Sequence, residues 1–97
     1  MPLPIGFHPE ALAEAVEAAA WYRERSAKAA AAFEAEIAHA MDRIAGAPDR
    51  YPPYIEESRR FLLRRFPFAI IYRVGSDRVE IVAVAHGRRR PGYWKHR

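Results

Sequence analysis

The sequence predicts an α+β fold in which an N-terminal helical hairpin packs on a small, mainly antiparallel β-sheet. Apolar residues recur at three- and four-residue intervals through residues 9–45, which is the period of an amphipathic helix. Three short runs rich in β-branched and aromatic residues follow between residues 61 and 85, separated by turn signals. The 97 residues leave room for one domain, 1–97, and the chain has no cysteine, so packing alone must hold it.

The first helix is expected to begin at Pro9, because proline is tolerated at the first helical position. Glu10 then places a negative charge at the positive end of the helix dipole. The helix should run to about residue 24. Its predicted apolar stripe consists of Leu12, Ala15, Val16, Ala19 and either Tyr22 or Arg23.

The second helix is expected to begin after Ser26, whose hydroxyl can cap its first turn. Gly46, in a left-handed conformation, and Pro48 should end it, so that the two helices form an antiparallel hairpin. Its predicted stripe consists of Ala30, Phe33, Ile37, Ala40, Met41 and Ile44. Because alanine buries little area, the larger side chains should supply most of the hydrophobic contact. These are Leu12, Phe33, Ile37 and Met41.

The three apolar runs predict an antiparallel meander, because only tight turns fit between them. The expected strands are 61–65, 68–74 and 79–85, and residues 3–7 could add an edge strand. Strand alternation places two sets on the face under the helices. They are Phe68, Ile70, Tyr72 and Val74, and Val79, Ile81, Ala83 and Ala85. The opposite face should carry Arg73 and His86, and the strand register decides which other arginines share it.

The charge is divided along the chain. Residues 1–57 hold five basic and ten acidic residues, a net charge of −5, whereas residues 58–97 hold eleven basic and two acidic residues, a net charge of +9. Fourteen of the sixteen cations are arginine, whose planar guanidinium binds phosphates and carboxylates in a bidentate manner. This division indicates a polyanionic target, an acidic protein partner or both; the simpler alternative is a soluble basic domain.

Several kinds of chemistry find no support in the sequence. The four histidines (His8, His39, His86 and His96) show no ligand spacing, so neither a metal nor a cofactor is expected. The helical acids Glu14, Glu17, Glu24, Glu34 and Glu36 fit solvated helix faces. There is no glycine-rich phosphate loop. No targeting or membrane-spanning segment is recognisable, and we therefore expect a cytoplasmic protein without a membrane partner.

The remaining candidates are arginines and aromatic residues on or beside the strands. The residues expected to bind a partner or target are Arg59, Arg60, Arg64, Arg65, Arg73, Arg88, Arg89, Arg90, Tyr93 and Trp94. Arginines beside a proton-transfer group, either Tyr93 or His86, could also cleave RNA without a metal. The alternatives are a solvated arginine run, aromatic rings that cover the sheet, and a locally hydrogen-bonded His86.

The segment from residue 61 to 94 resembles the RelE/ParE superfamily of toxins from bacterial type II toxin–antitoxin modules. It reads FLLRRFPFAIIYRVGSDRVEIVAVAHGRRRPGYW. Within it, FAIIYRV resembles the central strand of the superfamily, and the residues from Val79 to Trp94 resemble its last strand and tail. The helices at 9–45 match in placement, so the resemblance covers nearly the whole chain. It implies the fold predicted above.

The resemblance implies two alternative targets. RelE-like members cut mRNA in the ribosomal A site, and ParE-like members inhibit DNA gyrase without being nucleases. The cations and tyrosine of RelE-like catalysis fall at Arg60, Leu62, Ala69, Arg88 or Arg89, and Tyr93. Only part of that set is present, because positions 62 and 69 are apolar, and the loss of one oriented donor weakens transition-state stabilisation by about 2–4 kcal/mol. We therefore favour the ParE-like branch.

The resemblance also implies a cognate acidic antitoxin that forms a hetero-oligomer with the toxin. The +9 segment supplies electrostatic attraction for such a partner. The alternatives are a ribosome-dependent mRNA endonuclease, with Arg60, His86, Arg88, Arg89 and Tyr93 as its candidate catalytic residues, and a non-toxic RNA-binding regulatory module.

Overall fold

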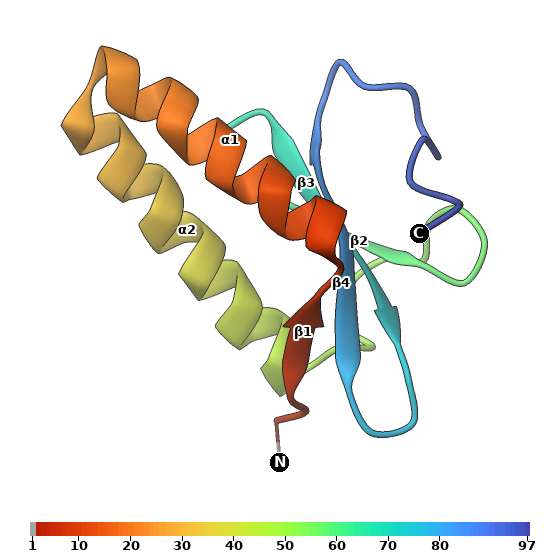
Figure 1. Ribbon diagram of the computed structural model, residues 1–97. Coiled ribbons are helices and arrows are strands. Elements are labelled where there is room, and N and C mark those ends of the chain that lie inside the picture. The colour runs from red at the N-terminus through yellow and green to blue at the C-terminus, as the bar shows by residue number, and fades with distance from the viewer. Residues whose placement is uncertain (1) are drawn as a thin grey trace.

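The computed structural model describes residues 2–97 (Figure 1). Its elements are β1 (Ile5–Phe7), α1 (Pro9–Arg25), α2 (Ala27–Gly46), β2 (Arg59–Leu62), β3 (Phe68–Val74) and β4 (Val79–His86). The sheet order is β1-β4-β3-β2, in which β1 runs parallel to β4 and the other neighbours are antiparallel. The predicted α+β class, helical hairpin, meander and edge strand are all confirmed.

The helical hairpin turns at Ser26, which serves both helices. Its N–H donates to the carbonyl of Tyr22 at 2.7 Å, and its Oγ accepts from the N–H of Ala29 at 3.1 Å. The predicted left-handed conformation of Gly46 is wrong, since Gly46 is the last residue of α2 without a positive φ, and Ala47 caps the helix with φ −153° and ψ 68°. Neither helix of residues 2–97 has the length and apolar character needed to cross a bilayer.

The main core lies between the hairpin and one face of the sheet. Phe33 and Ile44 of α2 and Tyr72 and Ile81 of the sheet are at most 1% exposed. A second, smaller core lies on the opposite face of the sheet, where Trp94 is also 1% exposed. The sheet is therefore covered on both faces, by the hairpin on one side and by residues near the C-terminus on the other.

Helix α1 turns a different side to the sheet from the one predicted. Its buried residues are Ala11, Ala18 and Ala19, while Leu12 and Val16 are 51% and 60% exposed. The large side chains of β3 and β4 fill the space beneath the helix, so the small side chains of α1 face them. The predictions that Leu12 belongs to the main contact and that Val16 lies in the buried stripe are both wrong.

A β-bulge in β4 changes the predicted alternation. Ile71 of β3 pairs with Ala83 and the next residue, Tyr72, pairs with Ile81, so Val82 has no partner in the register. Val82 and Ala83 both join the smaller core, and Val84 then lies under the helices. The predicted placement of Ala83 and Ala85 with Val79 is therefore wrong, because an extra residue inverts the faces beyond it.

Two other strand predictions also need correction. β2 spans Arg59–Leu62 instead of residues 61–65, because the carboxylate of Glu36 accepts hydrogen bonds from the N–H groups of Arg64 and Arg65 and holds both outside the strand. The ring of His86 packs edge-on against Phe68, at 5.1 Å between centroids. Phe68 packs on the main core, so the ring of His86 turns to the hairpin side of the sheet, although His86 at the end of β4 also borders the tail side.

Candidate functional site

The last residues of the chain fold back across the sheet face that the helices leave open (Figure 1). We call residues 87–97 the tail. Successive turns hold it, through bonds such as Tyr93 N–H to Arg90 O at 3.2 Å and Lys95 N–H to Gly92 O at 3.0 Å. Gly92 has a φ of +82°, a conformation that favours glycine. Trp94 anchors the tail by packing on Ile71, Val82 and Ala83.

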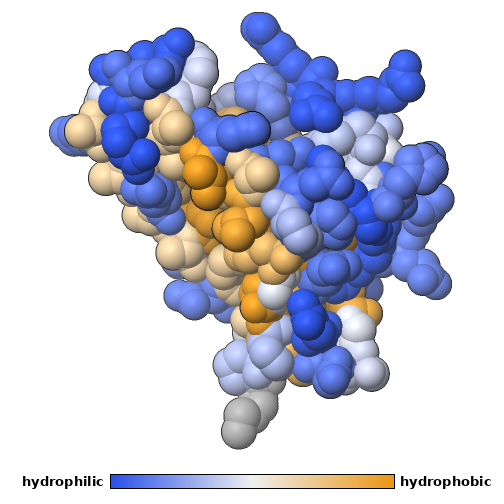
Figure 2. Space-filling model, viewed as in Figure 1, coloured by the Kyte–Doolittle hydropathy of each residue, from blue (hydrophilic) through white to orange (hydrophobic). Residues whose placement is uncertain are grey.

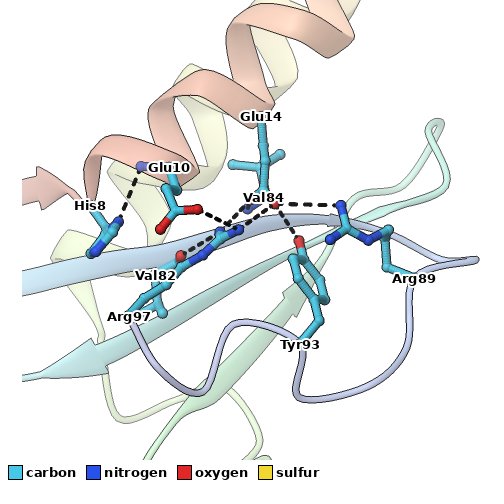
Figure 3. Close-up of polar contacts among 8 residues, drawn as sticks. All are labelled: His8, Glu10, Glu14, Val82, Val84, Arg89, Tyr93 and Arg97. Carbon is cyan, nitrogen blue, oxygen red and sulfur yellow. Dashed lines mark hydrogen bonds and ion pairs between the residues drawn. The ribbon is translucent and has the colours of Figure 1, made fainter.

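The carboxylate of Glu14 joins α1, β4 and the tail (Figure 3). Its Oε1 accepts from the N–H of Val84 at 3.0 Å and from Arg97 Nη1 at 2.9 Å. Its Oε2 accepts from the Tyr93 hydroxyl at 2.7 Å and from Arg97 Nη2 at 3.0 Å. A carboxylate has about four acceptor positions, so the contacts of Glu14 match its capacity. The expectation that Glu14 lies on a solvated face is wrong.

The edge of β4 explains why a carboxylate is needed here. β1 pairs with β4 only as far as Ile81, so the outward groups of the next residues have no strand beside them. The N–H of Val84 donates to Glu14, and the carbonyl of Val82 accepts from Arg97 Nη1 at 3.2 Å. Side chains from α1 and the tail thus take over the pairing that a longer β1 would supply, which satisfies otherwise unpaired backbone groups.

These contacts shift three ionisation equilibria. Burial raises the pKa of Glu14, but hydrogen bonds from Arg97, Tyr93 and Val84 outweigh it and leave the pKa below the ordinary value. Burial and the bond to Glu14 raise the pKa of the Tyr93 hydroxyl. The hydrogen bond to Glu14 raises the pKa of Arg97. We call these three side chains the Glu14 cluster. At neutral pH it therefore consists of an anionic Glu14, a neutral Tyr93 and a cationic Arg97.

Several of the predicted binding arginines are engaged within the fold. Arg59 Nη1 donates to the carbonyls of Tyr51 at 2.7 Å and Asp49 at 3.2 Å. Arg65 Nε lies 3.4 Å from Glu36, whose side chain is 11% exposed, so the solvated-face expectation is wrong for this acid also. Arg73 Nη1 donates to the carbonyl of Arg97 at 2.8 Å. These arginines hold loops and the tail in place.

Exposed cations of the predicted set lie in the tail and at Arg64 and Arg65. Arg88 and Arg90 are exposed, and the structure of residues 2–97 offers no hydrogen-bond or ion-pair partner to either guanidinium. Arg89 lies over the ring of Tyr93, at 3.8 Å from its centroid, and 3.9 Å from Glu14 Oε2. The tail therefore presents two accessible cations, Arg88 and Arg90, on either side of Arg89, which contacts Tyr93 and Glu14.

Six of the predicted residues surround a hollow of about 200 Å³ on the tail side of the sheet. They are Arg60, His86, Arg89, Arg90, Tyr93 and Trp94. The guanidinium of Arg60 lies over the ring of Tyr54, 4.4 Å from its centroid. Among residues 2–97, no group of three or more histidine and acidic side chains is placed to hold a metal ion.

Comparison of the sequence with models of known protein families gives one match. The family described as "ParE toxin of type II toxin-antitoxin system, parDE" matches residues 5–91. The chain belongs to this ParE toxin family. No curated protein matches the sequence significantly. A solved chain of the chromosomal ParDE toxin–antitoxin system from P. aeruginosa has the same fold, with a TM-score of 0.76 and 16% identity over 87% of this chain and 95% of that one.

Two of the positions that the resemblance matched to RelE-like catalytic cations lie side by side. Leu62 of β2 pairs with Ala69 of β3, and both line the hollow. Leu62 is 62% exposed, so an apolar side chain faces solvent at a position where the resemblance to RelE-like toxins would lead one to expect a cation. The hydroxyl of Tyr93, which the resemblance matched to the RelE-like tyrosine, points to the Glu14 carboxylate and donates a hydrogen bond to it (Figure 3).

Two residues of the cluster were missed from the sequence. Arg97 carries no local signal, because its partner lies 83 positions away. Glu14 does carry one, since it stands three residues after Ala11 and four before Ala18, both of which are buried. An acid at that helical spacing shares the buried face with its neighbours and needs a partner there.

Proposed function

We propose that this ParE-family chain inhibits DNA gyrase and does not cleave RNA. The observation that carries the proposal is the engagement of Tyr93: its hydroxyl donates to Glu14 at 2.7 Å, and its pKa is raised. A general base must accept a proton near neutral pH. Together with the apolar pair Leu62 and Ala69, this favours a toxin that acts by binding.

The proposed contact surface is the exposed basic part of the tail. Arg88 and Arg90 are accessible cations on a segment that Trp94 and Glu14 hold in one position. Such a fixed surface loses little conformational entropy on binding. We propose that it contacts gyrase and that its cations also attract the acidic segment of a cognate antitoxin, with which the chain forms a neutralised hetero-oligomer in the cytoplasm.

A supercoiling assay tests the target. Purified gyrase and relaxed plasmid are incubated with increasing amounts of the chain, and the wild type should block supercoiling. Arg88→Glu should weaken inhibition about tenfold or more, as expected when an interfacial charge is reversed. Arg50→Glu is the matched control, because it makes the same change at an exposed arginine in the acidic half of the chain.

A translation assay runs in parallel and decides the alternatives. If the chain leaves gyrase active at large excess but cuts mRNA on translating ribosomes, and Tyr93→Phe abolishes the cuts, the chain is a nuclease and the proposal is wrong. A third outcome is that the chain neither inhibits gyrase nor cuts mRNA, has no effect on growth when expressed, and binds RNA. That outcome would support the non-toxic RNA-binding regulatory module instead.

The antitoxin proposal has its own measurement. Dissociation constants of the toxin–antitoxin complex are compared for wild type and Arg88→Glu over a range of salt concentrations. The variant should bind more weakly, and the difference should shrink as salt screens the charges. An unchanged dissociation constant at every salt concentration contradicts a role for the tail cations in this complex.

A further inference from the structure

The hollow on the tail side of the sheet carries positive charge with no acid beside it. Of residues 2–97, those that line it include Arg60, Arg89 and Arg90 and no aspartate or glutamate. Two other hollows differ: one of about 450 Å³ beside α1 contains Glu17, and one of about 400 Å³ beside α2 contains Glu36. Figure 2 shows hydrophilic side chains over the tail, at the upper right in the view of Figure 1. We call this site the arginine hollow, and its charge is that of an anion-binding site.

Two of its three guanidinium groups stack on tyrosine rings. The guanidinium carbon of Arg60 lies 4.4 Å from the ring centroid of Tyr54, and that of Arg89 lies 3.8 Å from the centroid of Tyr93. Both tyrosines pack on the smaller core, which fixes their rings. A stacked guanidinium uses its face, whereas its N–H groups lie in the plane and remain able to donate. The two arginines are therefore oriented before a ligand binds, which lowers the entropic cost of binding.

The arginines of the hollow have unused hydrogen-bond donors. Arg60 is half-buried, yet the structure of residues 2–97 offers its side chain no hydrogen-bond acceptor and no ion-pair partner. Arg89 Nη1 lies 3.9 Å from Glu14 Oε2, which is too long for a hydrogen bond, and that carboxylate already accepts from other donors. Because a charge that leaves water without a counter-ion is costly, an anion in the hollow would stabilise Arg60 in this position.

The sheet supplies an apolar wall to the same hollow. Leu62, Ala69 and Ala85 form a row across three strands, since Leu62 pairs with Ala69 and Ala69 pairs with Ala85. All three line the hollow. The two alanines are small and leave its space open, while Leu62 is 62% exposed beside them. A matching ligand therefore has an apolar surface next to its anionic group.

The number of charges favours a phosphate monoester over other anions. At neutral pH a phosphate monoester carries a charge of about −1.5 to −2 and presents three acceptor oxygens. A carboxylate or a phosphate diester carries a single negative charge and presents two free oxygens. Guanidinium groups bind carboxylates and phosphates through paired N–H groups. Three arginines around one hollow therefore match the monoester best in both charge and acceptor number.

We propose that the arginine hollow binds the phosphate monoester of a nucleotide, with the phosphate among the arginines and the base against Leu62. The volume of about 200 Å³ is below the roughly 300–1,000 Å³ of sites that enclose a whole small molecule, so the base lies at the rim. Bases present flat faces that stack on aromatic and guanidinium groups, and Leu62 and Arg60 offer such a surface. The proposal concerns binding without a chemical step and does not depend on gyrase as the target.

Calorimetric titration with three adenine compounds tests the charge requirement. Adenosine monophosphate (AMP) carries a phosphate monoester, cyclic AMP carries a diester on the same nucleoside, and adenosine carries no phosphate. AMP should bind about tenfold or more tightly than cyclic AMP, because its second charge meets a further arginine, and adenosine should not bind at the same concentrations. Equal affinities for AMP and cyclic AMP, or no binding of AMP, overturn the proposal. A glutamate-rich peptide that binds when AMP does not would assign the hollow to carboxylates instead.

Two single-stranded oligonucleotides distinguish the sources of such a phosphate. They have the same sequence, and one carries a 5′-phosphate where the other carries a 5′-hydroxyl. If the phosphorylated strand binds more tightly than AMP, the ligand is the end of a nucleic acid; if AMP binds more tightly, it is a free nucleotide. Both results agree with the proposal. Equal binding of the two strands contradicts it, because only their phosphate diesters would then be recognised.

Substitutions at the hollow test its location. Leu62→Glu, at an exposed position, should leave the chain folded and weaken AMP binding about tenfold or more through repulsion; Leu12→Glu makes the same change at a leucine of α1 that is 51% exposed and should not. Arg60→Gln should also weaken binding about tenfold, whereas Arg64→Gln, at an exposed arginine outside the hollow, should not. Circular dichroism checks the fold of each variant. Equal AMP affinities of Leu62→Glu and Leu12→Glu would place the nucleotide elsewhere and overturn the proposal.

Discussion

The hairpin covers one face of the sheet with many apolar contacts, whereas the tail covers the other with one large side chain and a set of polar bonds. Phe33 and Ile44 bring the hairpin into the main core. The tail has Trp94 and depends on Glu14, a residue of the hairpin, for its remaining attachment. The tail thus requires the hairpin to be in place. The hairpin contributes Glu14 but packs mainly on the other face.

The loss of Trp94 is the largest change that this comparison predicts. Trp94→Ala should lower the free energy of unfolding by about 3–5 kcal/mol, because a buried aromatic side chain leaves a cavity. Urea denaturation measures the effect. Trp21→Ala is the control, since Trp21 is 52% exposed on α1, and it should cost less than about 1 kcal/mol. Equal losses would mean that the tail contributes no more than a surface side chain.

Glu14→Gln tests the polar attachment. At neutral pH it should cost about 1–3 kcal/mol, because the guanidinium of Arg97 loses its charged partner and the amide cannot accept every bond. Urea denaturation measures the loss against Glu17→Gln, an exposed control on the same helix that should have little effect.

The pH dependence of that loss follows from the lowered pKa of Glu14. Because the folded-state pKa lies below 4.5, the carboxylate stabilises the fold fully above pH 4.5, and this stabilisation disappears as pH falls through the lowered value. The difference between wild type and Glu14→Gln should therefore narrow in acid. A difference that stays constant would show that the charge of Glu14 does not matter.

Tyr93→Phe should have the smallest effect of the three. It removes one hydrogen bond to Glu14 but keeps the ring beneath Arg89, so the cost should be about 0.5–1.5 kcal/mol. Amide hydrogen exchange should locate the loss in the tail, with the helices unchanged. Tyr54→Phe is the control, because it leaves intact the ring contact of Tyr54 with Arg60. Faster exchange throughout the hairpin would contradict the distinction between the hairpin and the tail, because the loss would then not be confined to the tail.

The parts of the fold that local patterns determine were predictable. The cap at Ser26, the buried Phe33 and Ile44, and the strand β3 all follow from residues close in sequence. The bulge at Val82 was not, because the hydrophobic run through β4 reads the same with or without an extra residue. Leu12 and Val16 fit an apolar stripe by period, but the bulk of the sheet selected the alanine side of α1 instead.

The site was predicted in composition more than in arrangement. The hollow does gather Arg60, Arg89 and Tyr93, which chain order and spacing had indicated. The role of each depends on Glu14, whose partners lie 70 to 83 positions away. No local pattern records such a contact. Arg59 and Arg73 illustrate the same limit, since an arginine bonded to carbonyls has the same sequence appearance as a free one.

The parallel pairing of β1 with β4 has a consequence for biosynthesis. Ile5 pairs with Val79, so β1 must wait for a partner strand that is synthesised about 74 residues later. The hairpin is local and can form while the ribosome is still at work, but the sheet and the Glu14 contacts with Tyr93 and Arg97 cannot. The tail surface is therefore assembled only after the nascent chain has been extended through Arg97, and a partner of that surface cannot bind it before then.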